Sequence, residues 1–317
     1  MPVHTIDYSV TVDSDSKDIS ELTYSDSFRV PISKLSFQTD TASMEWLGKE
    51  ATASLTNEAD VRQIFSGYVN DVNFTRFPDI YDVSCGNILT RARNHWIITN
   101  ALDEYWTRSN ISASDLVKDL LAEAGITDYS GEDLPFTFGT KHDVEFNLLS
   151  VMDAIDQINN ILATTIYMDG STVKWGQIFP VPDGSASLTL DEFISISKTT
   201  ETKNLRNKVV VFGNGGIYAE ASAVSPYLPT DFYQTAIVSS QLIDTQDMAD
   251  QSAAYNLELY NKLGEELKVE VEGVPGLKVM DTVKVVHSPM SIDENWFVYS
   301  INHTYGETFT TRATLRK

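Results

Sequence analysis

The chain has 317 residues and a mass of 35.3 kDa, and 42% of its residues are apolar. This excludes a disordered or fibrous protein, and at roughly 150 residues per domain the length predicts about two domains. A formal net charge of -22 disfavours binding to nucleic-acid phosphates or anionic membrane surfaces. The lone cysteine cannot form an internal disulfide, and no run of about 18 apolar residues predicts a membrane span. We therefore expect a soluble protein.

The first segment, residues 1–95, has the pattern of short β-strands. Residues 5–12 alternate apolar and polar side chains, as a half-buried strand does, and residues 13–16 have the composition of a turn. Further strand patterns occupy residues 27–32, 34–37, 51–55, 64–69 and 80–86. Short strands at this spacing favour a small antiparallel barrel or sandwich.

The middle segment, residues 96–205, changes to helical periodicity. Ser112 and Asp115 form a capping-box pattern, and the helix that follows is expected to end at Gly125. A second helix is predicted from about residue 148 to 162, with Leu148, Met152, Ile155, Ile158 and Leu162 on its apolar face. A hairpin is expected over residues 165–175, because Asp-Gly at 169–170 suits a two-residue turn. This segment is predicted to be an inserted α+β domain.

Half of the excess negative charge lies in that middle segment, which holds 6 basic and 17 acidic side chains. Self-repulsion of this kind is typical of a well-solvated outer domain. A specific basic partner is the alternative interpretation.

The last segment, residues 206–317, returns to strands. A hairpin is predicted from residues 208–212 and 217–221, with Gly213–Gly216 at its tip, and a helix from 246 to 262. Strand patterns then occupy residues 267–271, 282–286, 296–301 and 309–315. We expect a second small barrel here.

Two patterns could bind ligands through loops. Gly213–Gly216 resembles a dinucleotide-binding loop, but the third glycine of that motif would fall at Tyr218 and no helix is predicted to follow. The acidic run at residues 13–18 lacks the oxygen ligand and the glycine that an EF-hand has at its fifth and sixth positions, because Lys17 and Asp18 stand there. A hairpin turn and a polar turn are the favoured interpretations.

The residues that most often ligate metals or attack substrates are scattered. No two histidines have helical spacing, and one cysteine cannot complete a thiolate zinc cluster. Cys85 has no adjacent base in the sequence that would make it a nucleophile. We therefore predict no metal, cofactor or catalytic site; the histidines are His4, His95, His142, His287 and His303.

Adjacent carboxylates such as Glu132–Asp133 or Asp293–Glu294 could serve glycoside hydrolysis, which also requires an aromatic-walled cleft. The five tryptophans are spread along the chain, which favours packing roles over a cleft; they are Trp46, Trp96, Trp106, Trp175 and Trp296. A carbohydrate-directed function is kept as an alternative.

The order of the motifs resembles the baseplate-hub, or late-control protein D, family of phage tails, which is related to the base of type VI secretion spikes. The motifs are, in chain order, 65–69, 81–89, the helix 115–121 ending at Gly125, Asn147 and the helix with Met152, Ile155 and Ile158, 166–170, 207–213, 271–283, 299–303 and 311–315. The family usually has a glycine near Met280, so the turn of this chain is expected to differ there.

The resemblance implies a mostly β, α+β fold in which two tube-type barrels, residues 1–95 and 206–317, flank a peripheral domain, residues 96–205. Three subunits would close a ring whose six barrels match the sixfold tail tube, with edge strands pairing between subunits. A central spike or tip would sit at the other end, and DNA would pass through the lumen without sequence-specific binding.

The same resemblance implies a structural, non-enzymatic role in a virion that assembles in the host cytoplasm. An electronegative lumen that repels DNA is a further hypothesis. Two alternatives remain: a carbohydrate-directed enzyme or binding protein of the tail tip, and a hexameric distal tail ring protein.

Overall fold

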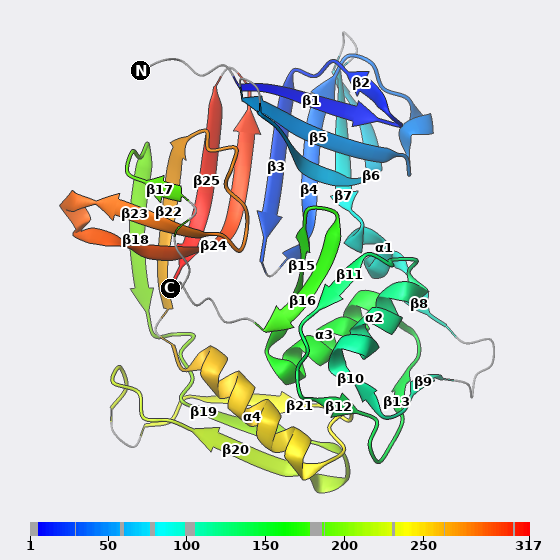
Figure 1. The fold of residues 1–317 in the computed structure, drawn as a ribbon, viewed down its shortest axis with the longest axis vertical. Helices are drawn as coiled ribbons and strands as arrows, with labels where there is room; N and C mark the ends of the chain where they lie inside the picture. Colours follow the sequence, from blue (N-terminus) through cyan, green and yellow to red (C-terminus); the bar gives the residue numbers. More distant parts are fainter. Residues whose placement is uncertain are drawn as a thin grey trace. The chain divides into compact units, whose positions relative to one another are not determined.

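The structure, a computed structural model, describes residues 6–28, 30–57, 60–76, 80–98, 105–177, 186, 188–229, 232–262, 264–306 and 308–317. The chain forms two compact units, drawn in Figure 1. Unit 1 comprises residues 1–90, 180–198 and 266–317, and unit 2 comprises residues 91–179 and 199–265. The chain therefore passes from unit 1 into unit 2 twice.

Unit 1 is built on a 13-stranded sheet. Its strands from the N-terminal end are β1 (Ile6–Val12), β2 (Asp15–Lys17), β3 (Glu21–Ser27), β4 (Val30–Thr39), β5 (Glu50–Asn57), β6 (Asp60–Arg76) and β7 (Ile80–Asn87). The others are β17 (Leu188–Leu190), β18 (Ser195–Glu201), β22 (Gly264–Glu272), β23 (Thr282–His287), β24 (Ile292–Tyr305) and β25 (Phe309–Arg316). Two short 3-10 helices, η1 (Met44–Trp46) and η3 (Ser288–Met290), connect strands that are consecutive in the chain.

The two ends of the chain repeat one strand order. The first half-sheet runs β3-β4-β7-β6-β5-β1, and the second half-sheet runs β18-β22-β25-β24-β23-β17. When the strands of each half are numbered along the chain, both orders are second-third-sixth-fifth-fourth-first. One direction differs, because β1 is antiparallel to β5 whereas β17 is parallel to β23.

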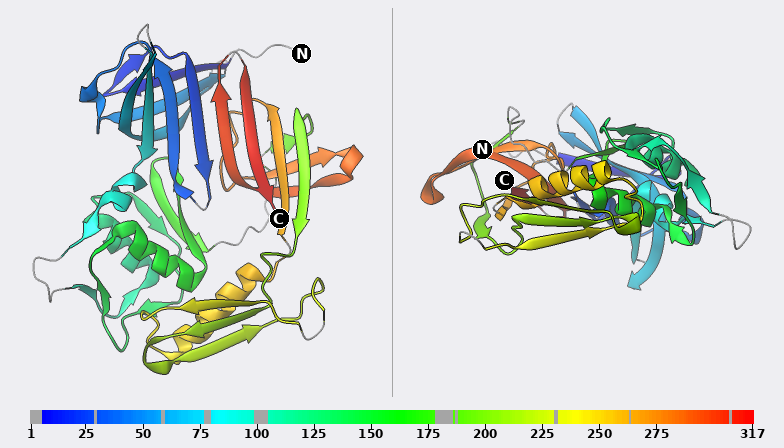
Figure 2. Two further views of the ribbon diagram at one scale, coloured as in Figure 1. Left: turned by 180° about the vertical axis from the view of Figure 1, so that it is seen from behind. Right: turned by 90° about the horizontal axis from the view of Figure 1, so that it is seen from below.

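The two half-sheets are joined. From the sequence a separate barrel is expected at each end, but β3 pairs with β24, so strands from both ends form one continuous sheet. Figure 2 (left) shows β3, in blue, beside the orange-red and red strands of the other end. The reason is that a strand has hydrogen-bonding groups on both edges, and an open barrel leaves one edge available.

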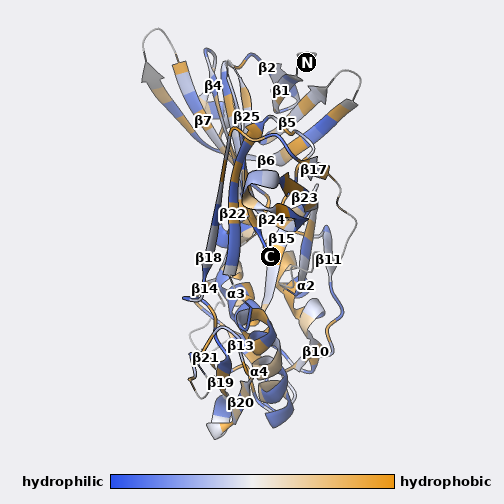
Figure 3. Cartoon of the chain, turned by 90° about the vertical axis from the view of Figure 1, so that its left-hand side faces the viewer, coloured by the Kyte–Doolittle hydropathy of each residue, from blue (hydrophilic) through white to orange (hydrophobic). Residues whose placement is uncertain are grey.

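The side chains on one face of this sheet form the core of unit 1. Strand residues alternate between a buried apolar face and a polar face, as the banded colouring of the strands in Figure 3 illustrates. The buried residues form one cluster that includes Leu35, Leu55 and Val83 from the first half-sheet and Leu267, Val285 and Leu315 from the second. A shared core explains why the two ends fold as one unit.

The first part of unit 2 packs two helices against short strands. Its elements are α1 (Leu89–Asn94, which begins in unit 1), β8 (Trp96–Ile97), β9 (Trp106–Arg108), β10 (Ile111–Ser112), α2 (Ala113–Glu123), β11 (Tyr129–Gly131), β12 (Thr137–Phe138), β13 (Val144–Phe146), β14 (Leu149–Ser150), α3 (Val151–Leu162), β15 (Thr164–Asp169) and β16 (Thr172–Gln177). The buried apolar faces of α2 and α3 supply about half of its core.

Both predicted helices of this part are confirmed, with one correction. Ser112 caps α2 as predicted, because its hydroxyl accepts from the amide of Asp115. The second helix begins three residues later than predicted, after a capping box of Ser150 and Asp153. Leu148 therefore lies outside it, at a φ of +55° and 67% exposed, and is not part of the apolar stripe.

The predicted hairpin is confirmed, but its turn lies one residue further along. Asp169 pairs with Thr172, so the two turn residues are Gly170 and Ser171. Gly170 has a φ of +63°, a conformation that glycine adopts without steric cost.

The second part of unit 2 is a small three-stranded sheet covered by a helix. The strands β19 (Lys208–Phe212), β20 (Tyr218–Ser222) and β21 (Thr235–Ser239) lie in the order β20-β19-β21. Figure 1 shows α4 (Gln246–Tyr260) across this sheet, and η2 (Asn214–Gly216) forms the tip between β19 and β20. The predicted hairpin and the predicted helix are thus both present.

The units do not follow the boundaries expected at residues 95 and 205. Residues 206–265 belong to unit 2 rather than to a second barrel, and residues 188–198 belong to unit 1 rather than to a peripheral domain. The physical reason is that β19, β20 and α4 bury their apolar faces on one another, for example Val209, Val211 and Ala249. None of the helices in the described part of the chain has the length and hydropathy needed to cross a bilayer.

Candidate assembly edges of the sheet

The junction between β3 and β24 is the candidate model for assembly contacts, because it joins the two repeated halves. It is antiparallel, from Ser300 opposite Ser27 to Tyr305 opposite Leu22. Leu22 and Tyr305 are 1% and 2% exposed, so the junction is closed to water on its core side.

Aromatic packing fills the centre of the junction. His303, opposite Tyr24 in the register, stacks on its ring with the centroids 6.0 Å apart and the ring planes at 18°. The Nδ1 atom of His303 lies 2.9 Å from the hydroxyl of Thr311. Burial is the main cause that lowers the pKa of His303 from 6.5 to about 4, and the nearby charge of Arg62 lowers it further. The imidazole is therefore neutral at pH 7.

The half-sheets correspond residue by residue. The pairing of β6 with β7 shifts between Phe74 and Arg76, a shift that the pairing of β24 with β25 lacks. The two fifth strands share one shift against the sixth strand: between Val69 and Asp71 on β6, and between Val298 and Ser300 on β24. Superposing these two bulges makes Asp71 equivalent to Ser300. Position by position, the buried residues then agree between the halves; the pairs are Ala51/Val283, Ala53/Val285, Leu35/Leu267, Phe37/Val269, Val83/Ala313 and Cys85/Leu315.

The same correspondence makes β18 the equivalent of β3. At the start of β3 the amide of Ser20 donates to the carbonyl of Gln38 at 3.0 Å, and at the start of β18 the amide of Ile194 donates to the carbonyl of Glu270 at 2.8 Å. Gln38 and Glu270 are equivalent, because they pair with the equivalent residues Asp82 and Arg312.

Two open strand edges correspond to the two sides of the β3·β24 junction, whereas β2 and β17, which also have one strand partner each in the described part of the chain, do not. Strand β6 pairs with β5 only up to Tyr68, so residues 70–76 have no strand on that side. Strand β18 pairs with β22 alone, and five of its seven side chains are exposed. By equivalence, the first edge corresponds to the half of β24 that β3 covers, and the second corresponds to β3 itself.

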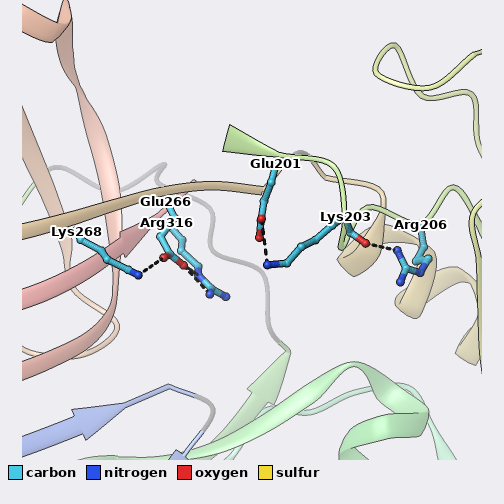
Figure 4. Close-up of polar contacts among 6 residues, drawn as sticks. All are labelled: Glu201, Lys203, Arg206, Glu266, Lys268 and Arg316. Atoms are coloured by element: carbon cyan, nitrogen blue, oxygen red, sulfur yellow. Dashed lines mark hydrogen bonds and ion pairs between the residues drawn. The ribbon is translucent and has the colours of Figure 1, made fainter. Parts of the chain in front are cut away.

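The face of the sheet opposite the core is polar and carries charges of both signs. Arg312 donates a hydrogen bond to Glu270 at 3.0 Å. Glu266 forms ion pairs with Arg316 at 2.8 Å and with Lys268 at 3.6 Å. Figure 4 shows the contacts of Glu266, together with the pair of Glu201 and Lys203 in unit 2. A shallow groove of about 430 Å³ follows this face along β18, β22, β25 and β24.

The loop patterns noted in the sequence are turns with protein partners. Gly213–Gly216 forms the tip between β19 and β20, where Gly213 lies against Ile243 and leaves no room for a Cβ atom. In the acidic run, Asp13 has its carboxylate 3.0 Å from the ammonium of Lys49. Among the described residues, no three His, Cys, Asp or Glu side chains are grouped to hold a metal ion.

Cys85 is buried, and the carboxylates of the two adjacent pairs contact other protein groups. Burial raises the pKa of the Cys85 thiol to about 12, which keeps it protonated. Asp293 and Glu294 are neighbours on β24, so their side chains lie on opposite faces, with Asp293 paired to Lys284 at 2.8 Å. Glu132 accepts the amide of Gln177 at 2.8 Å.

The architecture is similar to that of several solved structures. The tail protein of Neisseria meningitidis MC58 superposes with a TM-score of 0.74 at 13% identity, over 99% of this chain and 97% of that chain. The 43 kDa tail protein of prophage MuSo2 from Shewanella oneidensis gives 0.69 at 10% identity, over 98% and 96%. The chain has the fold of these two tail proteins.

The same fold is found in a component of a type VI secretion system. The E. coli c3393 protein, described as similar to the T4 bacteriophage tail proteins gp27 and gp5, gives a TM-score of 0.60 at 9% identity, over 96% of this chain and 76% of that chain. Neither a scan against protein-family models nor a search of curated proteins found a match. The mostly β, α+β fold class predicted from the sequence is confirmed.

Sequence reasoning missed the edge strand β18. Residues 195–201 were assigned to the peripheral segment, although Ile196 between Ser195 and Ser197 is an alternation typical of a strand. The signal is weak because an edge strand with one partner needs few apolar side chains.

Proposed function

We propose that this protein is a structural hub of a phage tail or baseplate, in which three copies form a ring with sixfold pseudo-symmetry. The likeness to tail proteins and to a type VI secretion component over nearly the whole chain supports a structural role in a tail. In this role the ring joins the tail tube to a central spike or tip and leaves a channel for DNA.

The observation that carries the proposal is the repeated half-sheet. Each chain holds two sheets of the same strand order, joined edge to edge through β3 and β24. A chain with two like segments can contact a sixfold tube at six equivalent places when three copies surround the axis. Both end segments of the chain then form the wall of the ring, and the second of them consists of residues 188–198 and 266–317.

The polar face of the sheet is our candidate for the channel lining. It is rich in hydroxyl and amide side chains, among them Ser25, Ser36, Ser84, Asn302 and Thr314, and its ion pairs combine both charges. Phosphates would find no continuous cationic track there. The acidity of the chain is thus not concentrated on this face, and a neutral, weakly binding lumen replaces the electronegative one as our proposal.

Light scattering on the purified chain tests the proposal. Three copies, a mass of three times 35.3 kDa, would support the hub, and class averages in electron microscopy should then show a ring of six similar lobes. Six copies would favour the distal tail ring instead. A monomer at all concentrations that hydrolyses a polysaccharide would favour the carbohydrate-directed alternative.

A further inference from the structure

The three-stranded sheet of unit 2 is covered on one face and open on the other. On the covered face, Val209, Val211 and Ala219 are at most 4% exposed beneath α4 (Figure 1). Because side chains alternate along a strand, the positions between these residues lie on the open face. The pairings of β19 with β20 and with β21 arrange that face in three rows: Ser222, Lys208 and Thr235; Glu220, Val210 and Ile237; and Tyr218, Phe212 and Ser239.

Aromatic side chains lie at both ends of this open face. Tyr218 and Phe212 are 46% and 44% exposed, and their ring centroids are 5.5 Å apart with the planes at 60°. At the other end, the ammonium of Lys208 lies 5.7 Å from the ring centroid of Tyr233, which is 55% exposed. In the middle row, Ile237 is 69% exposed. Apolar side chains gathered on the surface of a folded protein indicate a binding surface.

An oriented polar network lies between the aromatic ends. The hydroxyl of Tyr218 donates to Oε2 of Glu220 at 2.6 Å, and the ammonium of Lys208 lies 2.9 Å from the same oxygen. The bond from Tyr218 is the main cause that lowers the pKa of Glu220, and Lys208 lowers it further, so the carboxylate is ionised at pH 7. Both contacts use Oε2. The other oxygen, Oε1, is therefore an acceptor for a ligand, and the ammonium has further protons to donate.

A saccharide matches this combination of groups. Its C–H faces pack on aromatic rings, and neighbouring hydroxyls donate and accept, so one hydroxyl pair can bond Glu220 and Lys208 together. A wholly apolar partner would remove this ion pair from water without replacing its hydrogen bonds, which costs free energy. A single, paired cation offers little to nucleic-acid phosphates, and the net charge of -22 repels acidic sugars.

We infer that the open face of β20-β19-β21 binds a neutral oligosaccharide, which lies across the three rows between Tyr233 and Tyr218. Glu220 and Lys208 bond its hydroxyls, and the aromatic rings at each end contact its C–H faces. This inference goes beyond the proposed function, because joining a tail tube to a spike requires no ligand on this sheet.

Saturation-transfer difference NMR on the full chain tests the inference. The probes are neutral oligosaccharides of different linkage and substitution: cellohexaose, chitohexaose, mannohexaose, maltohexaose and xylohexaose. We expect saturation to pass from the protein to the ring C–H protons of at least one probe, because those protons contact the aromatic side chains. Titration of that probe in a calorimeter then gives its Kd.

Three variants locate the binding surface. Tyr233→Ala removes the ring at one end, and Glu220→Ala removes the carboxylate; both side chains are exposed, so the fold should be kept. Each variant should raise the Kd of the probe by at least about fivefold. Phe74→Ala is the matched control, because it removes an aromatic side chain that is 56% exposed but belongs to unit 1. Its Kd should equal that of the wild type.

Several results would overturn the inference. Saturation transfer to none of the probes would do so, and so would an unchanged Kd in both Tyr233→Ala and Glu220→Ala. Binding of oligothymidylate that is lost in Tyr233→Ala would assign the face to nucleic acid instead. A smaller mass of Tyr233→Ala than of the wild type in light scattering would assign it to a contact between copies. None of these results bears on the hub role, which the mass of the wild type tests separately.

Discussion

The rings of Tyr24 and His303 are stacked nearly parallel, at 18°, with their centroids 6.0 Å apart, although the two residues come from opposite ends of the chain. The two residues lie on β3 and β24, the strands that join the two half-sheets. Their contact makes one sheet, with one shared core, from two repeated halves.

The stability of this junction should depend on pH through His303. Its pKa in the folded chain, about 4, lies below the ordinary 6.5, so protonation favours the unfolded chain. Its contribution is complete above pH 6.5 and decreases as the pH falls toward 4. Between pH 7 and pH 5 this amounts to about 2 kcal/mol of unfolding free energy.

The measurement is urea unfolding of the wild type and of His303→Gln at both pH values. The variant should lose less stability on acidification, whatever its stability at pH 7. Equal losses in the two proteins would show that His303 is not the titrating group.

Leu148 and Ile158 should respond oppositely to truncation, although the sequence places both on one helical stripe. Ile158 is fully buried, so Ile158→Ala should cost about 2–5 kcal/mol, whereas Leu148 is 67% exposed and Leu148→Ala should change stability by no more than about 0.5 kcal/mol. Thermal or urea unfolding compares the two variants. Similar losses in the two variants would indicate that Leu148 is buried and would contradict the start of α3 at Val151.

Asp244 should anchor the two parts of unit 2 to each other. Its carboxylate is 2% exposed and accepts from the Thr140 hydroxyl at 2.8 Å and from the amides of Lys141 and His142 at 2.7 and 3.0 Å. Burial opposes ionisation, but the amide bonds prevail and lower the pKa of Asp244 below its ordinary value.

Asp244→Asn should therefore destabilise the protein by about 1–3 kcal/mol at pH 7, because two backbone amides lose a charged, buried acceptor. The loss should shrink as the pH falls through the folded-state pKa of Asp244, where the wild type also loses its charge. Asp250→Asn, on an exposed face of α4, is the control and should be nearly neutral. A pH-independent difference would argue against the charge as the cause.

Local sequence patterns are sufficient to predict most of the individual elements. Period-2 alternation predicts the strands, and Ser112 with Asp115 predicts the start of α2, because side chains near in sequence decide which face is buried and which amide is capped. The family resemblance, read from the order of these elements, predicted the fold class.

The identity of neighbouring strands does not follow from local sequence patterns. The hydrogen-bonding groups of every strand are alike, so the pattern of β3 does not say that β24 will lie beside it, nor that β18 will be left at an edge. For the same reason, residues 206–265 were expected in a barrel but belong to unit 2. Partner choice depends on packing between side chains far apart in the chain, such as Tyr24 and His303, and on the core that they share.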